Sequence, residues 1–398
     1  MRPEDLRERM RVSFPRFRPG MLPLALAGAI LSCDNGVTGP TPSGWSMITT
    51  ATTSCGLYRA RAYCWGPEGF GFLGDGVDTL PSGAASLPKP IAGNLVFTSL
   101  AATFVDHGCG VAGGTAYCWG RNDYGQLGDG TSSIRAVPKP VAGSLRFSSV
   151  SVGDSHSCGL TSTGQAYCWG LDQLGQLGDY PGTAFSDSVP QAVYGTGRYT
   201  FISGGEAYTC ALDVAGKAWC WGENGAGELG DTLYFHVNFP VAVAGNLTFT
   251  SISAGSNHTC GVTTSGEAYC WGLGTSGEVG NDSLASFLTP QKVATSFRFK
   301  SVSPGSRFTC GLTTDGAAVC WGFGLSGQLG NAVTGFSRTP LPVSTDLRFT
   351  ALSVGVGHAC GITADGAAYC WGAGAEGELG NGSDLFSFSP VQVQNPVP

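Results

Sequence analysis

The sequence predicts an all-β protein, a seven-bladed β-propeller, and three observations lead to this fold class. The tripeptide Cys-Trp-Gly occurs seven times in the 398 residues, at intervals of about fifty residues. Around each copy, four short stretches of alternating polar and apolar residues are separated by Gly or Pro turns, and no stretch has a helical period. Because four short strands cannot bury both faces of a sheet alone, the units must pack against one another around an axis.

The repeat unit is clearest in residues 249–292. A first stretch that begins at Phe249 leads to Cys260, and a hairpin-like stretch follows as far as Cys270. Trp-Gly, a Gly-rich turn and a closing stretch with Pro290 complete the unit. Seven such units fill residues 45–398, which we expect to be one propeller domain. The sequence leaves open how the ring closes, including whether the terminal strands share one blade.

A second motif carries a family resemblance. Trp-Gly is followed by Gly-Gln-Leu-Gly at Gly125–Gly128, Gly175–Gly178 and Gly327–Gly330. This pattern resembles the regulator of chromosome condensation repeat, and the resemblance covers essentially the whole chain after residue 44. It implies a seven-bladed β-propeller. The same superfamily includes a secreted beta-lactamase inhibitor protein, and its best-known member is a guanine-nucleotide exchange factor for a small GTPase.

Fourteen of the fifteen cysteines fall two per unit, nine or ten residues apart. Two residues opposite each other in a hairpin have their Cα atoms within reach of a disulfide, and closing a loop of about ten residues contributes roughly 2.7 kcal/mol in the chain-entropy model. Paired zinc ligands are usually separated by only about two to four residues, and free buried thiols are the other alternative. We therefore predict one disulfide-linked hairpin per blade. The predicted pairs are Cys55 with Cys64, Cys109 with Cys118, Cys158 with Cys168, Cys210 with Cys220, Cys260 with Cys270, Cys310 with Cys320, and Cys360 with Cys370.

The spacing of each cysteine pair agrees with the turn between its two members. A spacing of ten leaves a three-residue loop, which in the fifth unit is Thr264-Ser265-Gly266, with Gly at the position that takes a left-handed conformation. A spacing of nine leaves a two-residue turn, which in the second unit is Gly113-Gly114. The first unit has Arg59-Ala60 at its turn, a pair that fits such a turn poorly.

Residues 1–33 are predicted to be an export signal. Basic residues precede an apolar stretch too short to span a bilayer, and the stretch ends in Ile30-Leu31-Ser32-Cys33, which resembles a bacterial lipobox. By that resemblance Cys33 is lipidated after cleavage; an ordinary signal peptide is the alternative. Residues 34–44 then form a flexible tether. We expect an extracytoplasmic bacterial lipoprotein, anchored to a membrane in the periplasm or at the cell surface, or else a secreted protein.

Several repeated residues are predicted to be structural. Four histidines stand two residues before the first Cys of their unit, but Phe308 takes this place in another unit, so we predict a hydrogen bond within the blade and not a metal or catalytic set. The Gln of Gly-Gln-Leu-Gly alternates with Glu, which argues against acid–base catalysis there. The Asp or Asn after this motif is predicted to be a turn residue, and the repeated Trp to pack between blades. We expect no catalytic residue, metal or cofactor. The four histidines are His107, His156, His258 and His358.

The segments after each Gly-Gln-Leu-Gly or Gly-Glu-Leu-Gly motif differ in length and carry aromatic residues. By the repeat geometry, we expect them on one face of the ring. Aromatic side chains on variable loops of a rigid scaffold are typical of recognition surfaces; the alternative is that each ring packs into the groove between neighbouring blades. The candidate partner-binding residues are Tyr180, Phe185, Tyr234, Phe235, His236, Phe287, Phe336, Phe386 and Phe388.

The charge and the motifs together limit the function. A net charge of −7 without a basic stripe repels phosphate backbones, so nucleic acid is not expected as a partner. Our leading hypothesis is a monomeric, extracytoplasmic binding scaffold that recognises a protein or glycan through one propeller face and touches the membrane only through its lipid. The alternatives are a guanine-nucleotide exchange factor, by the family resemblance, and a hydrolase or lyase that acts on cell-envelope polymers.

Overall fold

A computed structural model describes residues 44–78, 83–102, 107–182, 184–332 and 334–396. The predicted signal peptide, Cys33 and all but the last residue of the predicted tether lie outside the described residues. No helix in the described part is long and apolar enough to cross a membrane. The described part contains 28 strands in seven antiparallel sheets of four consecutive strands each. The strands, four to a blade, are β1 (Trp45–Thr50), β2 (Ser54–Tyr58), β3 (Arg61–Glu68), β4 (Gly83–Pro90); β5 (Phe97–Ala102), β6 (His107–Ala112), β7 (Thr115–Gly120), β8 (Arg135–Pro140); β9 (Phe147–Val152), β10 (His156–Thr161), β11 (Ala166–Leu171), β12 (Ser186–Ala192); β13 (Tyr199–Gly204), β14 (Tyr208–Asp213), β15 (Ala218–Gly222), β16 (Val237–Ala242); β17 (Phe249–Ala254), β18 (His258–Thr263), β19 (Ala268–Gly272), β20 (Phe287–Lys292); β21 (Phe299–Pro304), β22 (Phe308–Thr313), β23 (Ala318–Phe323), β24 (Phe336–Pro342); β25 (Phe349–Val354), β26 (His358–Thr363), β27 (Ala368–Gly372) and β28 (Ser387–Gln392).

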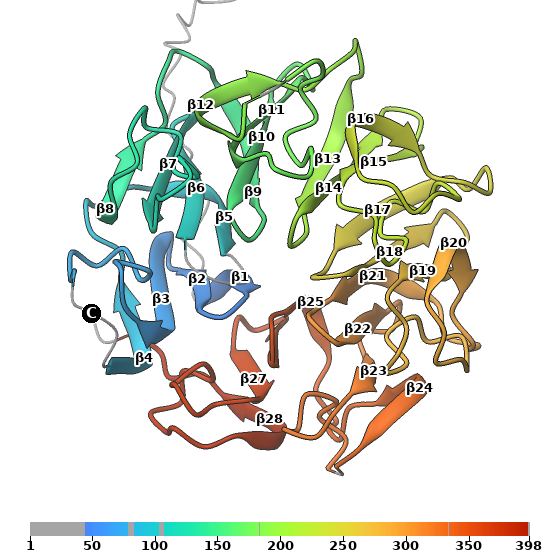
Figure 1. Ribbon diagram of the computed structural model, residues 1–398. Coiled ribbons are helices and arrows are strands. Elements are labelled where there is room, and N and C mark those ends of the chain that lie inside the picture. The colour runs from blue at the N-terminus through green and yellow to red at the C-terminus, as the bar shows by residue number, and fades with distance from the viewer. Residues whose placement is uncertain (1–43, 79–82, 103–106, 183, 333, 397–398) are drawn as a thin grey trace, which may run out of the picture. The chain divides into compact units, whose positions relative to one another are not determined.

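The seven sheets form the blades of a ring, which confirms the predicted propeller (Figure 1). The first strand of each blade lies nearest the centre and the fourth lies at the outer edge. Blade 7 packs directly against blade 1, where the backbone N–H of Thr50 donates to Ser353 Oγ at 2.9 Å. Every blade is continuous in sequence, so the terminal strands do not share a blade. Contacts between complete blades therefore close the ring, and they include a backbone hydrogen bond from the N–H of Val356 to the oxygen of Ala51 at 3.0 Å.

Each blade holds its two cysteines in a disulfide across the central hairpin, with Cα atoms 4.0–4.1 Å apart. All seven predicted pairs are confirmed. The bonds join Cys55 to Cys64, Cys109 to Cys118, Cys158 to Cys168, Cys210 to Cys220, Cys260 to Cys270, Cys310 to Cys320, and Cys360 to Cys370.

The hairpin turns take the predicted conformations. In the fifth hairpin Cys260 lies opposite Cys270, and Gly266 has a positive φ of 75°. In the first hairpin Arg59 and Ala60 have φ values of 49° and 64°. Two residues with a Cβ atom therefore take the left-handed conformation that glycines take in the second hairpin.

The repeated tryptophans are buried between neighbouring blades, as predicted. Trp271 of blade 5 donates its indole N–H to the backbone oxygen of Glu228 in blade 4 at 2.8 Å. The side chain of Glu228 turns back and accepts the backbone N–H of Ala226 at 2.9 Å. Burying one indole removes about 200 Å² from water, which favours packing by roughly 5 kcal/mol. Each Gly-Gln-Leu-Gly or Gly-Glu-Leu-Gly loop thus holds its own backbone and anchors the next blade.

The histidines form hydrogen bonds, but the prediction that these bonds lie within the blade is wrong. His258 Nε2 lies 2.8 Å from the hydroxyl of Thr309 in the next blade. Because that hydroxyl donates to the backbone oxygen of Glu278 at 2.9 Å, the histidine nitrogen is the donor. The histidine position faces the neighbouring blade. The pairing of residues within one hairpin does not reveal this contact. The equivalent pairs are His107 with Ser157, His156 with Thr209 and His358 with Ser54.

Candidate functional site

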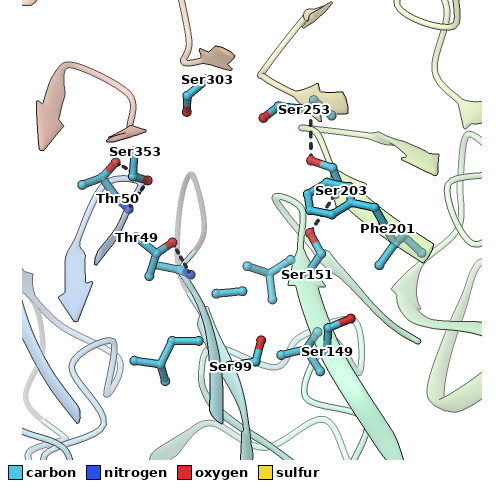
Figure 2. Close-up of a pocket in the computed structure, with 18 of the residues that line it drawn as sticks. Thr49, Thr50, Ser99, Ser149, Ser151, Phe201, Ser203, Ser253, Ser303 and Ser353 are labelled. Carbon is cyan, nitrogen blue, oxygen red and sulfur yellow. Dashed lines mark hydrogen bonds between the residues drawn. The ribbon is translucent and has the colours of Figure 1, made fainter. Parts of the chain in front are cut away.

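The central channel is a polar cavity of about 380 Å³ lined mainly by the first strands of the blades (Figure 2). Most of its hydroxyls are used for holding blades together. Ser203 Oγ, for example, accepts the backbone N–H of Ala254 in the next blade at 3.0 Å. In the blade that follows Ser253, Pro304 takes the strand position of Ala254, and proline has no N–H to donate. None of the described lining residues is charged, so the channel offers few groups for recognition or chemistry.

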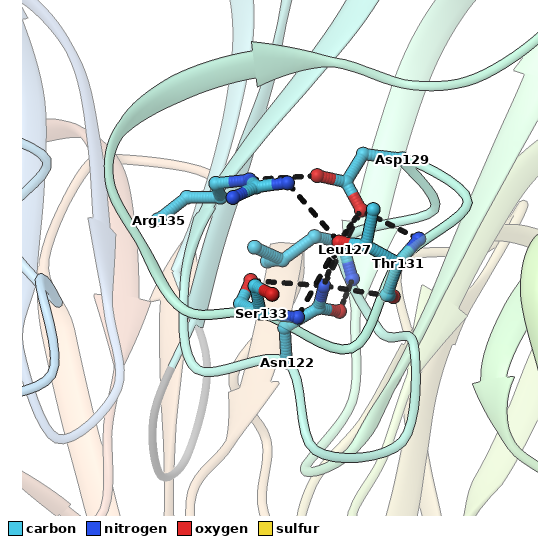
Figure 3. A network of polar contacts seen from close by, with 6 residues as sticks. All are labelled: Asn122, Leu127, Asp129, Thr131, Ser133 and Arg135. Atoms are coloured by element: carbon cyan, nitrogen blue, oxygen red, sulfur yellow. Dashed lines mark hydrogen bonds and ion pairs between the residues drawn. The ribbon is translucent and has the colours of Figure 1, made fainter.

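In the loop after β7, which is one of the variable segments, the carboxylate of Asp129 is paired with the basic side chain of Arg135 (Figure 3). Asn122 donates to the backbone oxygens of Thr131 and Ser133 at 3.0 and 3.1 Å. Asp129 accepts the N–H of Thr131 at 3.0 Å and Arg135 Nε at 2.8 Å. Burial alone would raise the pKa of Asp129, but the hydrogen bonds from Thr131 and Arg135 hold it below its usual value. The prediction of a turn residue is confirmed here.

In blade 3, the three positions equivalent to Asn122, Asp129 and Arg135 all carry carboxyl groups. They belong to Asp172, Asp179 and Asp187. Asp172 takes the place of Asn122, and Asp187 takes the place of Arg135, since each pairs with the Gly of its Trp-Gly. Burial, and then the charges of Asp179 and Asp187, raise the pKa of Asp172 to about 7. In the described part of the chain, no group of three or more His, Cys, Asp or Glu side chains is placed to hold a metal ion.

The candidate partner-binding residues lie in several different settings. Seven of the nine are exposed, and Phe287 and Phe388 are half-buried. The prediction that all nine lie on loops is wrong for Phe287, Phe336 and Phe388, which belong to β20, β24 and β28. The fourth strand begins earlier than expected because it pairs back to the Gly of Trp-Gly. Tyr234 and Phe235 are strongly exposed, at 63% and 72%.

Exposed aromatic rings gather on blades 2 to 4. The ring centroids of Tyr180 and Tyr194 are 5.3 Å apart, and those of Tyr180 and Phe239 are 5.8 Å apart. Tyr124 and Phe185 form a second pair at 6.2 Å. We call these five residues the aromatic sector. Sequence reasoning missed Tyr124, Tyr194 and Phe239; for Tyr194 a signal existed, because five other blade connections have Ala or Ser at its place.

Two pockets open beside the aromatic sector. One, of about 450 Å³, brings together Phe185 and His236, two of the predicted residues, with Asp172 and Asn238. The other, of about 530 Å³, is lined by residues 194–199, 213, 214, 219, 239 and 240. Concave sites with aromatic walls and a few polar groups are the usual form of ligand pockets.

Charged groups border the larger pocket. Asp213 Oδ2 accepts the indole N–H of Trp219 at 3.0 Å, and its other oxygen accepts the backbone N–H groups of Ala215 and Lys217, each at 2.9 Å. Burial would raise the pKa of Asp213, but these hydrogen bonds and the charge of Lys217 lower it. The Lys217 ammonium lies 5.1 Å from the centroid of the Trp219 ring, within cation–π range.

Comparisons with known proteins agree with this fold. The structure of human WBSCR16 has 20% sequence identity and a TM-score of 0.75, over 84% of this chain and 94% of that chain. Prp20p from Saccharomyces cerevisiae has 18% identity and a TM-score of 0.75, over 88% of each chain. The ectodomain of the Arabidopsis thaliana receptor kinase ACR4 has 20% identity and a TM-score of 0.55, over 88% of this chain and 98% of that chain. Among curated proteins, no sequence matches this chain significantly. The family model of the RCC1-like domain matches residues 61–397, and the chain therefore belongs to the RCC1-like domain family.

Proposed function

We propose that this protein is an extracytoplasmic binding scaffold that engages a partner protein or glycan through the aromatic sector and the two pockets beside it. The observation that carries the proposal is the clustering of exposed aromatic rings on one part of a disulfide-linked ring. Exposed aromatic patches on a rigid scaffold are typical of interaction sites. In this proposal the protein acts as a monomer, by binding alone and without catalysis or nucleic acid.

The compartment follows from the cysteines. Seven disulfides indicate an oxidising environment, because disulfides are rare in reducing compartments. The finer part of the proposal is a lipid on Cys33 that anchors the protein to a membrane. Mass spectrometry of the mature N-terminal peptide should find a lipid on Cys33, and Cys33→Ser should release the protein from the membrane fraction. An unmodified mature N-terminus beyond residue 33 would contradict the anchor.

The binding surface is tested by capture on intact cells. The purified domain is crosslinked to cell-surface material, and the captured molecule is identified and its affinity measured. Tyr180→Ala with Phe185→Ala should weaken capture at least tenfold, because both rings are exposed parts of the aromatic sector. Phe386→Ala is the matched control, since Phe386 is an exposed aromatic residue of blade 7. Unchanged capture by the double variant, or equal loss with Phe386→Ala, contradicts the proposal.

Nucleotide exchange on a small GTPase is the second candidate. It is motivated by the likeness to Prp20p, whose structure is described with its binding to Gsp1p and histones. At 18% identity that likeness carries the fold alone. Small GTPases act in the reducing cytosol, whereas seven disulfides favour an oxidising compartment. A GTPase recovered as the captured molecule, with faster nucleotide release in the presence of this protein, would favour exchange over the scaffold.

A further inference from the structure

At most connections between blades, one apolar side chain covers the hydrophobic core, and we call this residue the plug. It stands two positions before the aromatic residue that opens the next blade, and in each case it packs against the hydrophobic cluster between the two blades. The connection from blade 3 to blade 4 has Gly197 at this position. The cluster there includes Val193 and Tyr199 but no residue between them. The five plugs are Leu95, Leu145, Leu247, Phe297 and Leu347.

The larger pocket lies where the plug is missing. Its lining includes Gly197 together with Tyr194, Trp219 and Phe239, and Tyr194 and Phe239 are 51% and 39% exposed. Tyr194 replaces Ala or Ser of the other connections, and Trp219 replaces Tyr or Val of the other blades. The missing plug and the larger rings occur together only in this connection, and they create an open space with aromatic walls.

The hydroxyl of Tyr199 occupies part of the vacated space. A Cβ atom added at Gly197 would lie 2.6 Å from Tyr199 Oη, so the present arrangement needs glycine. The corresponding residue is Phe or Trp at the other blades, and these rings have no hydroxyl. Restoring the plug therefore requires two changes, Gly197→Leu and Tyr199→Phe.

One cation, Arg198, lines the pocket, and a second, Lys217, lies over the ring of Trp219, which forms part of the pocket wall. Both carry positive charge in a chain whose net charge is −7. Arg198 donates to the backbone oxygens of Thr196 and Gly197. In the described part of the chain, neither Arg198 nor Lys217 forms an ion pair within 4 Å of a carboxylate. The carboxylate of Asp213 lines the same pocket and accepts three hydrogen bonds, so it offsets one of the two positive charges and leaves a net charge of +1 on these three groups. The rim therefore favours a ligand with a negative charge next to its apolar part.

We propose that this pocket binds a leucine- or phenylalanine-sized side chain of a partner polypeptide, next to a carboxylate that Arg198 and Lys217 attract. The chain itself shows what fits, because Leu or Phe fills the equivalent space at five other connections. The inference rests on the proposed binding function and gives it a ligand chemistry. It selects a polypeptide over a glycan.

The probe is N-acetyl-L-phenylalanine, titrated into the purified domain and followed by NMR. We expect saturable binding with a dissociation constant on the order of 1 mM, as befits a ligand of this size. N-acetyl-L-phenylalaninamide, which lacks the carboxylate, should bind several-fold more weakly, and N-acetylglycine should show no saturation. Raising the salt concentration should weaken only the carboxylate probe. If the probe shows no saturable binding at concentrations up to about 20 mM, which is 20-fold above the expected dissociation constant, the inference is overturned.

The plug variant, Gly197→Leu with Tyr199→Phe, should bind the probe at least tenfold more weakly than the wild type. Its Tm should be no lower than that of the wild type. Gly225→Leu is the matched control and should bind like the wild type: it adds a leucine at an exposed glycine outside the pocket, where the nearest atom to an added Cβ lies 3.9 Å away. Phe239→Ala, which removes a half-exposed wall, should bind several-fold more weakly and serves if the plug variant does not fold. Equal binding by the plug variant, loss in the control, or competition by a neutral oligosaccharide overturns the inference. If a captured partner depends on Tyr180 and Phe185 but still binds the plug variant, the proposed function stands and this pocket assignment fails.

Discussion

At the scale of single residues, one repeated slot holds Gln in three blades and Glu in three others. Glu228 and Gln126 make the same bond, since each side-chain oxygen accepts a backbone N–H two residues earlier. An amide does this without charge, whereas burial raises the pKa of Glu228 to about 7. The unfolded chain releases this proton near pH 4.5. Glu228 therefore destabilises the fold increasingly as pH rises from about 4.5 to 7 and remains unfavourable above it.

Glu228→Gln should remove this pH-dependent penalty. The variant should gain stability over the wild type as pH rises from 5 to 8, by up to about 3 kcal/mol because one pKa unit corresponds to about 1.4 kcal/mol. Denaturant unfolding at the two pH values measures the difference. Glu376→Gln, an exposed change, should alter stability little at either pH. A gain that is equal at both pH values would show that removing the buried charge is not the cause.

At the scale of the hairpin, the two-residue turns share one backbone conformation although their sequences differ. The second hairpin turns through Gly113 and Gly114, and the first turns through Arg59 and Ala60 with the same sign of φ. Residues with a Cβ atom are strained by about 1–2 kcal/mol each in this conformation. The disulfide and the ladder of blade 1 impose the turn on a sequence that does not favour it.

Replacing this turn with Asn-Gly, by Arg59→Asn and Ala60→Gly, should stabilise the domain by about 1 kcal/mol, since Asn-Gly is the preferred pair for such a turn. The loss of chain freedom on folding offsets part of the relief at residue 60. Thermal unfolding with the disulfides intact measures the effect. The reverse change in blade 2, Gly114→Ala, should destabilise; if both changes are neutral, the turns are not strained.

At the scale of the whole ring, hydrogen bonds from one blade to the next repeat around the axis. His156, His258 and His358 each donate to a hydroxyl of the following blade, and that hydroxyl donates back to the loop of their own blade. Burial lowers the pKa of His156 and His258 to about 3 and that of His358 to about 4. For His156 the charge of His107 adds to this effect. The folded ring therefore keeps these imidazoles neutral.

Acid should weaken the ring through these histidines. Below about pH 6.5 the unfolded chain takes up a proton at each imidazole and the folded chain does not, so each contributes a loss of up to about 1.4 kcal/mol per pH unit down to its folded pKa. The buried acids Asp172 and Glu228 act in the opposite direction. His258→Gln isolates one imidazole: its stability should fall less steeply between pH 6.5 and 4 than that of the wild type. Equal slopes in denaturant unfolding would contradict this account.

The repeat made the blades predictable from the chain alone. Hydrophobic alternation around each Cys-Trp-Gly, a glycine at the hairpin turn and two cysteines nine or ten residues apart are local features. Local features determine strands, turns and cross-hairpin pairs because these depend on neighbours within about ten residues. Seven copies then predict seven blades, and the structure confirms the ring and the disulfides.

Apart from the burial of the repeated Trp between blades, the contacts between blades were beyond the sequence, because they join residues about fifty positions apart. The sequence identified the histidines but placed their bonds in the wrong blade, and it listed Tyr180 without its partners Tyr194 and Phe239. The missing plug at Gly197 is visible in the sequence as a break in the repeat. Only the packed ring decided that this break opens a pocket, because an absent side chain leaves space only where the neighbouring blades do not close over it.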